Sequence, residues 1–222
     1  MPYSIAIDGP AGAGKSTIAR AVARELGFVY VDTGAMYRAV GFYCLSEGIP
    51  IRTEERVCEA VRDITVRIAY DAAGEQRVYL NGEDVSVRIR TQEVGDAAST
   101  VSQYPLVREK LVALQQQLAR ESSVVMDGRD IGTKVLPQAN LKIYLTASEE
   151  VRAERRFREL REKGQRISLP EVLREVRERD YRDMHREHSP LRQAADAVLL
   201  DASALSIDET IDAILALLDR TT

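Results

Sequence analysis

Hydrophobic positions in the first 32 residues follow two different periodicities. Residues 3–8 and 28–32 are short, mostly apolar runs, whereas apolar residues recur at every fourth position in residues 16–26, just before Gly27. The runs are typical of buried strands, and the fourfold spacing indicates an amphipathic helix that ends at the glycine. The chain is therefore predicted to open with a strand, a helix and a second strand.

Three later apolar runs complete this pattern. Residues 124–127, 141–145 and 197–200 each resemble a buried strand, and each is separated from the next by helical or connecting sequence. Strands that alternate with helices in this way indicate a parallel sheet flanked by helices, which is an α/β fold.

Residues 64–90 have a different pattern. Polar and apolar positions alternate here, and the Asn81-Gly82 pair is a strong hairpin signal. We expect a small antiparallel β insertion, bounded by helices at residues 35–47 and 91–103.

Three further helices are predicted from their start signals. Ser148 is followed by two glutamates, Ser168 and Glu171 form a capping-box pattern, and Ser206 and Glu209 form another.

Composition excludes several classes of protein. The 31 basic and 35 acidic residues give a net charge of -4, which argues against coating nucleic acid or anionic lipid by bulk charge. Cys44 and Cys58 are too far apart for a redox or zinc pair, and no apolar run approaches the roughly 20 residues of a membrane span. We expect a cytoplasmic protein without nucleic-acid or membrane partners.

The turn after the first predicted strand carries the chemistry. Residues 9–16, GPAGAGKS, match the phosphate-loop pattern GxxxxGK[ST] at every fixed position. Backbone N–H groups in such a loop converge on phosphate oxygens, Lys15 reaches the outer phosphates, and Ser16 can ligate Mg²⁺. The residues expected to hold a nucleotide are Gly9, Pro10, Ala11, Gly12, Ala13, Gly14, Lys15, Ser16 and Thr17.

A phosphate loop fits either a kinase with a small acceptor or a GTPase switch. The guanine-reading pattern NKxD is absent, and the DxxG match at Asp71 to Gly74 falls in the turn of the predicted hairpin. These observations favour the kinase.

The acceptor is expected at the carboxyl ends of the strands, because ligands of open α/β sheets bind there. The sequence VDTGAMYR places Asp32, Thr33, Tyr37 and Arg38 at that edge, although Thr33 could instead only cap the next helix.

Two further segments add charge to the acceptor site. Asp127, Arg129 and Asp130 follow the 124–127 strand in the same way. Arg179, Asp183 and Arg186 are spaced i, i+4, i+7, so they share one helix face, which could alternatively be a solvated side with one ion pair.

Arginines also crowd the helix that begins near Ser148, at Arg152, Arg155, Arg156, Arg158 and Arg161. A mobile flap that brings positive charge over a transferring phosphoryl group has this composition. Alternatively, several of these arginines pair with neighbouring glutamates along the surface.

The sequence shows no obvious general base. An acceptor that is itself a phosphate monoester, with a second pKa of about 6, needs orientation and charge neutralisation and no deprotonation. An arginine-rich site therefore suits a nucleoside monophosphate better than a sugar hydroxyl.

The motifs IDGPAGAGKST, VDTGAMYR, LNGEDVS with IRTQEV, MDGRDIGT and ERDYRD occur in order along the chain. Together they resemble bacterial cytidylate kinases, a family of nucleoside monophosphate kinases. The resemblance implies a monomeric enzyme that uses ATP and Mg²⁺ to phosphorylate CMP and dCMP. Kinases of UMP or AMP, then shikimate- or gluconate-type kinases, then the GTPase switch remain the alternatives.

The resemblance also implies roles for individual residues. Together with the phosphate loop and the arginine-rich helix, this gives Lys15, Asp127, Arg129, Arg155 and Arg156 as the expected catalytic residues. The CMP phosphate would meet Thr33, Arg38 and Arg129; cytosine would meet Ser99, Arg108, Asp130 and Arg186; the ribose would meet Arg179 and Asp183. Tyr37 belongs to the same acceptor site, and Asp127 would orient the substrate or a water on the metal.

We therefore predict a P-loop NTPase-type α/β fold with a small antiparallel insertion and a helical lid. The core would comprise residues 1–34, 103–152 and 188–222, the acceptor-binding insertion residues 35–102, and the lid with its following helix residues 153–187.

Overall fold

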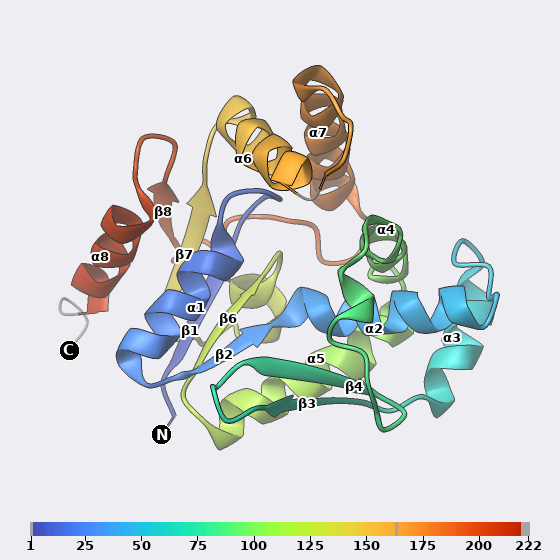
Figure 1. The fold of residues 1–222 in the computed structure, drawn as a ribbon. Coiled ribbons are helices and arrows are strands. Elements are labelled where there is room, and N and C mark those ends of the chain that lie inside the picture. The colour runs from blue at the N-terminus through green and yellow to red at the C-terminus, as the bar shows by residue number, and fades with distance from the viewer. Residues whose placement is uncertain (1, 163, 219–222) are drawn as a thin grey trace.

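A five-stranded parallel sheet forms the centre of the protein (Figure 1) in the computed structural model, which describes residues 2–162 and 164–218. The strand order is β2-β6-β1-β7-β8, so β2 and β8 are the edges. The strands are β1 (Ser4–Asp8), β2 (Val29–Asp32), β6 (Val124–Gly128), β7 (Leu141–Thr146) and β8 (Val198–Asp201). The predicted α/β class is confirmed.

Alternating side chains of the strands pack on two helical layers. Ile5 and Ile7 belong to an apolar cluster with α1 (Lys15–Leu26) and α8 (Ile207–Leu218). Ala6 lies in a second cluster with α2 (Thr33–Ser46) and α5 (Pro105–Glu121). Because every strand is parallel, all five carboxyl ends meet at one edge of the sheet, which is where the site forms.

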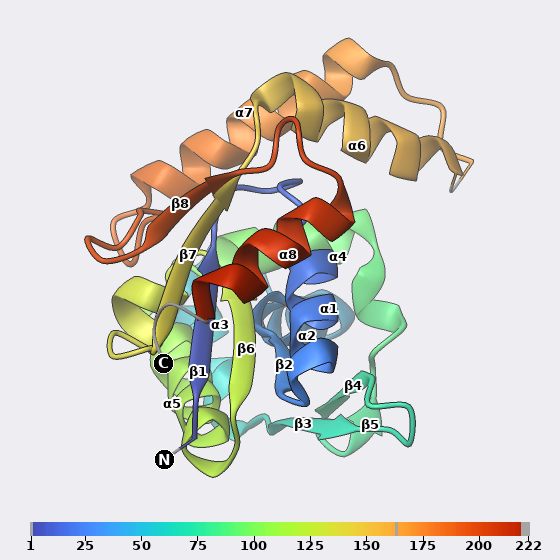
Figure 2. The same cartoon turned by 90° about the vertical axis from the view of Figure 1, so that its left-hand side faces the viewer.

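The predicted antiparallel insertion is present (Figure 2). Asn81 and Gly82 both have positive φ, 50° and 88°, in the turn between β4 and β5, as the hairpin signal indicated. The second apolar cluster runs without interruption from the central sheet through α2 into this small sheet. The elements of this region are α3 (Glu54–Asp63), β3 (Val66–Tyr70), β4 (Gln76–Leu80), β5 (Glu83–Asp84), η1 (Arg88–Arg90) and α4 (Gln92–Val101).

The helices α6 (Glu149–Glu162) and α7 (Leu169–His185) lie above the carboxyl edge of the sheet (Figure 1). They have an apolar cluster of their own, formed by Ala153, Leu160, Val172 and Val176. Within the residues described, no helix is both long and apolar enough to cross a bilayer.

The start signals at Ser168 and Ser206 are confirmed. At Ser206, the Glu209 carboxylate accepts a hydrogen bond from the Ser206 N–H at 2.8 Å, and the Ser206 hydroxyl accepts one from the Glu209 N–H at 3.2 Å. The Glu171 carboxylate accepts hydrogen bonds from the backbone N–H and the hydroxyl of Ser168, at 2.8 and 2.6 Å. Thr91 Oγ1 accepts from the N–H of Val94 at the start of α4.

Other boundaries differ from the prediction. The helix expected from residue 35 begins at Thr33, because Asp32 caps it by accepting a hydrogen bond from the N–H of Ala35. The helix α5 was not predicted; it follows Tyr104 without a capping side chain. A one-turn π-helix, η2 (Ile131–Val135), follows β6 and was not predicted.

Candidate functional site

The phosphate loop connects β1 to α1, and its shape depends on glycine. Gly14 has a left-handed φ of 90° at the start of α1. A Cβ atom at Gly9, whose φ is 153°, would lie 1.9 Å from the carbonyl oxygen of Leu145. The loop can therefore lie against β7 only if residue 9 has no side chain.

Lys15 lies on the inner side of this loop. Its Nζ donates a hydrogen bond to the carbonyl of Pro10 at 2.7 Å, and the residue as a whole is 5% exposed. Burial, and then the positive charge of Arg129, lower the pKa of Lys15 well below its usual value. An anion beside this ammonium group would offset both effects.

Asp127 at the end of β6 meets the loop. Ser16 Oγ donates to one carboxylate oxygen at 2.9 Å, and the hydroxyl of Tyr30 donates to the other at 2.8 Å. Burial, followed by the nearby charge of Asp32, raises the pKa of Asp127. Both oxygens are thus fixed between the phosphate loop and the acceptor side.

Thr33 does not cap the next helix, because Asp32 does. Instead, Thr33 Oγ1 donates a hydrogen bond to the carbonyl of Asp127 at 2.7 Å. The second carboxylate oxygen of Asp32 accepts from Arg38 Nη2 at 2.7 Å. The Nε of Arg38 is buried and, within the described chain, has no hydrogen-bond partner.

The face of α7 that carries Arg179 and Asp183 points into the site. Asp183 accepts a hydrogen bond from Arg129 Nε at 2.8 Å. The Nε of Arg179 is a second buried donor that lacks a partner in the described chain. Burial and the adjacent Arg129 lower the pKa of Arg179 to about 10, so the guanidinium stays charged at neutral pH.

A third part of the site surrounds Asp130. Its carboxylate pairs with Arg108 and lies 3.6 Å from Arg186 Nη2. The Arg108 guanidinium carbon lies 5.6 Å from the ring centre of Tyr37. These groups form one polar wall of the pocket, which Ser99 on α4 also lines.

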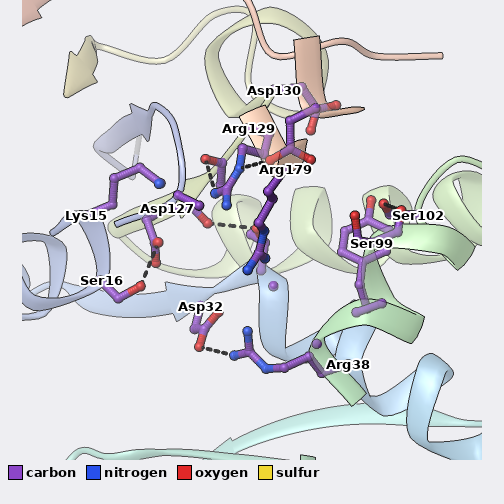
Figure 3. Close-up of a pocket in the computed structure, with 18 of the residues that line it drawn as sticks. Lys15, Ser16, Asp32, Arg38, Ser99, Ser102, Asp127, Arg129, Asp130 and Arg179 are labelled. Carbon is purple, nitrogen blue, oxygen red and sulfur yellow. Dashed lines mark hydrogen bonds and ion pairs between the residues drawn. The ribbon is translucent and has the colours of Figure 1, made fainter. Parts of the chain in front are cut away.

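One pocket brings together most of the residues singled out from the sequence (Figure 3). Lys15 and Ser16 lie on one side, Ser99 lies on the other, and Arg179 projects between them. The other predicted residues that line it are Ala11, Gly12, Gly14, Thr17, Asp32, Thr33, Tyr37, Arg38, Arg108, Asp127, Arg129, Asp130, Asp183 and Arg186. Arg186 immediately follows α7 and still shares its pocket face.

The arginines of α6 have different environments. Arg155 donates to the carbonyls of Ala13 and Ala202, at 3.4 and 2.8 Å, and lines an adjoining pocket next to the phosphate loop. Arg156 lines that pocket too and donates to the Gln92 side chain at 2.7 Å. Arg158 pairs with a glutamate on the surface, which is the alternative considered for this helix.

The buried Arg152 also belongs to this helix. It donates to Asp180 at 2.6 Å and to the carbonyl of Ala11 at 3.1 Å, so it joins α6 both to α7 and to the phosphate loop.

In the turn between β3 and β4, the Asp71 carboxylate accepts the N–H groups of Ala73 and Glu75, both at 3.0 Å. The DxxG match is therefore a structural turn.

Sequence reasoning missed two groups at this site. Ser102 lines the pocket three residues after Ser99, and helical spacing could have found it. No sequence pattern indicated that the hydroxyl of Tyr30, within a strand, reaches Asp127.

The sequence of the chain matches a family model and several known proteins over nearly its whole length. The family model described as cytidylate kinase matches residues 5–220. A cytidylate kinase of Desulfitobacterium hafniense is 54% identical over 213 residues, which is 96% of this chain and 91% of the relative. One of Caldicellulosiruptor saccharolyticus is 50% identical over 214 residues, covering 96% and 94%.

The fold also resembles that of a solved structure. A gluconokinase from Sinorhizobium meliloti superposes with a TM-score of 0.50 at 19% identity, covering 99% of this chain and 93% of its own. That likeness shows a shared fold and nothing about substrate. The family model and the relatives cover nearly the whole chain, and the chain belongs to the cytidylate kinase family.

Proposed function

We propose that this protein transfers the γ-phosphoryl group of ATP to CMP, with dCMP as a second acceptor. Family membership supports the reaction. The structural observation that carries the proposal is the pair of buried, unpaired Nε donors of Arg38 and Arg179, in one pocket with the buried Lys15. Buried cationic donors without partners are costly, and phosphate groups would satisfy them.

The donor would bind along the phosphate loop. Backbone N–H groups of residues 9–17 and the positive end of α1 suit its phosphates. Arg155 and Arg156, in the adjoining pocket, can offset the charge that develops on the transferring group. This assigns residues 153–187 the role of a lid over the donor.

The oxygen donors at the loop fit Mg²⁺. The hydroxyl of Ser16 and the carboxylate of Asp127 are hard oxygen ligands that already lie together. Mg²⁺ commonly takes one or two protein oxygens and fills its remaining positions with phosphate oxygens and water. When bound, the ion would neutralise phosphate charge, and Tyr30 would keep the Asp127 carboxylate oriented.

The acceptor phosphate would lie among Thr33, Arg38 and Arg129. All three residues line the pocket, and the Thr33 hydroxyl is bonded to the carbonyl of Asp127. The acceptor's own dianionic phosphate oxygen then forms a bond to the γ-phosphorus. The bond from that phosphorus to the β,γ-bridging oxygen breaks, and the electron pair stays with the departing ADP.

The nucleoside would occupy the pocket beyond its phosphate. Ser99, Arg108, Asp130 and Arg186 combine hydroxyl, cationic and carboxylate groups that can pair with the edge of cytosine. Arg179 projects between the phosphate loop and Ser99 (Figure 3), Asp183 lines the same pocket, and both would contact the ribose. The Tyr37 ring lies next to the Arg108 guanidinium. Residues 35–102 would then act as the acceptor-binding insertion.

A coupled assay for ADP formation, with CMP, dCMP, UMP and AMP offered separately alongside ATP and Mg²⁺, tests the proposal. We expect turnover with CMP and dCMP and at least about tenfold lower kcat/KM with UMP and AMP, because one or two mismatched hydrogen bonds at a buried base cost that much. Preference for UMP or AMP would reassign the acceptor. No turnover with any of the four would refute the proposal.

A further inference from the structure

The edge strand β2 is contacted by one cross-strand pair of the small sheet. Tyr70 of β3 and Gln76 of β4 are directly opposite each other in the register. The hydroxyl of Tyr70 donates to the carbonyl of Tyr30 at 3.0 Å. Gln76 Oε1 accepts from the N–H of Asp32 at 2.8 Å, and its Nε2 donates to the carbonyl of the same residue at 3.2 Å.

These bonds replace a missing neighbouring strand. Because β2 is the edge of the central sheet, its outward backbone groups have no strand partner among the described residues on that side. The Gln76 amide presents one acceptor and one donor, as a paired strand would. The end of β2 is therefore held by side chains 40 and 44 residues further along the chain.

The two β2 residues held in this way both reach the site. Tyr30 donates its hydroxyl to Asp127. Asp32 caps α2 through one carboxylate oxygen and accepts from Arg38 through the other. A displacement of the Asp32 backbone would consequently move both the start of α2 and the guanidinium group that it orients.

Gln76 is not required to attach the small sheet. Ile68, Val78 and Leu80 of the small sheet belong to the same buried apolar cluster as α2 and the central sheet. This apolar contact dominates docking, since each buried aliphatic side chain contributes about 1.5–3 kcal/mol, whereas a hydrogen bond contributes about 1 kcal/mol net. The apolar cluster therefore attaches the small sheet, and the Gln76 amide fixes the position of the Asp32 backbone against it.

We infer that Gln76 is a positioning residue for the acceptor phosphate, acting through the backbone of Asp32 on Arg38. This inference rests on the proposed function for its choice of acceptor. The substitution that tests it is Gln76→Met, which keeps the length of the side chain and removes both polar groups. The matched control is Arg77→Met, at the next position of the same strand, where the wild-type side chain pairs with Asp71 in the hairpin.

Initial rates are measured for wild type and both variants while CMP and ATP are varied in turn. We expect Gln76→Met to raise KM for CMP about 3- to 10-fold, the effect of losing about one net hydrogen bond, and to leave KM for ATP within about twofold. Arg77→Met should leave both KM values near wild type. Tyr70→Phe, which removes only the bond to Tyr30, should give a smaller rise in KM for CMP.

The outcomes separate this inference from the proposed function. If wild type phosphorylates CMP but Gln76→Met has the same KM for CMP as Arg77→Met, the positioning role is wrong. An equal rise in both KM values would indicate general loosening and would also overturn it. If wild type itself fails with CMP, the proposed function is what fails. Should Gln76→Met not fold, Gln76→Asn, which is one methylene too short to make both bonds, takes its place in the same comparison.

Discussion

Arg129 donates its Nε–H to Asp183 across 2.8 Å and thereby joins the end of β6 to α7. Burial alone would raise the pKa of Asp183, but Arg129 and Arg179 overcome that effect and hold it below the usual value. The carboxylate is therefore ionised at neutral pH, and it balances two guanidinium groups at once. The acceptor site depends on this balance.

Replacement of Asp183 by alanine should weaken both stability and turnover. Removing one partner of a largely buried ion pair leaves uncompensated positive charge, so we expect the free energy of unfolding to fall by about 3 kcal/mol at neutral pH. Because the pKa of Asp183 is depressed in the native state, this contribution is present above pH 4 and is lost as pH falls through the native pKa. Denaturant unfolding at pH 7 and at pH 3 measures the difference.

The same variant should distinguish the two acceptors. If Asp183 contacts the ribose, its loss should lower kcat/KM for CMP more than for dCMP, since only CMP offers a 2′-hydroxyl group. Parallel assays with both nucleotides measure the ratio. Equal losses would contradict the assigned ribose contact.

Lys15→Ala should abolish phosphoryl transfer. The buried ammonium group is positioned next to the loop that would hold the phosphates, and loss of one such stabilising group typically costs about 100- to 1000-fold in kcat. Lys134→Ala, at an exposed lysine, is the control. Near-normal turnover by folded Lys15→Ala protein would show that the loop works without this side chain.

Two arginines on α6 offer a matched comparison. Arg155 faces the phosphate loop, whereas Arg158 forms a surface pair with Glu154. We expect Arg155→Ala to lower kcat by about tenfold or more, because it removes positive charge next to the transferring group, and Arg158→Ala to leave kcat unchanged. Steady-state kinetics with saturating CMP would detect the contrast, and similar kcat values for both variants would refute it.

Asp8 should make kcat depend on pH. Its carboxylate accepts the N–H groups of Ile131 and Gly132, both at 2.7 Å, so it fixes the turn that follows Arg129. Burial is the main cause that raises the pKa of Asp8 to about 6. Protonation converts one acceptor oxygen into a donor that faces an N–H group, so we expect kcat to decline as pH falls through about 6.

Asp8→Asn is the corresponding test. Its amide cannot accept both N–H groups, so kcat should be low at every pH, and the pH dependence that remains should report the acceptor phosphate alone. The effect of Asp8 on stability runs in the opposite direction to its effect on kcat. Between pH 3.8 and about 6 the native state binds more protons than the unfolded state, because the native pKa is raised. The contribution of Asp8 to the free energy of unfolding therefore falls as pH rises through this range. Identical pH–rate profiles for wild type and variant would contradict the role of Asp8.

Local patterns predicted those parts of the molecule that local physics determines. The phosphate loop has fixed residue types because its backbone geometry demands them, as the contact between Gly9 and Leu145 illustrates. The apolar runs of the five strands and the capping signal at Ser168 are equally local. The spacing of Arg179 and Asp183 was sufficient to place both on one face of α7.

Contacts between distant segments were beyond such patterns. The bond from Tyr30 to Asp127 joins residues 97 positions apart, and the bond from Gln76 to Asp32 joins residues 44 apart. Tyr30 and Gln76 are residue types that also occur in strands without any such contact, so the sequence around them gave no signal. The short helix α3 was missed because only Val57 and Val61 are buried on it, which is too little apolar periodicity to recognise.

The separate apolar cluster between α6 and α7 has a consequence for local opening. Ala153, Leu160, Val172 and Val176 pack with one another and not with the two large clusters on the sheet. Amide protons of these two helices should therefore exchange with solvent deuterium sooner than those of β1 or β6, through fluctuations that leave the rest of the molecule intact.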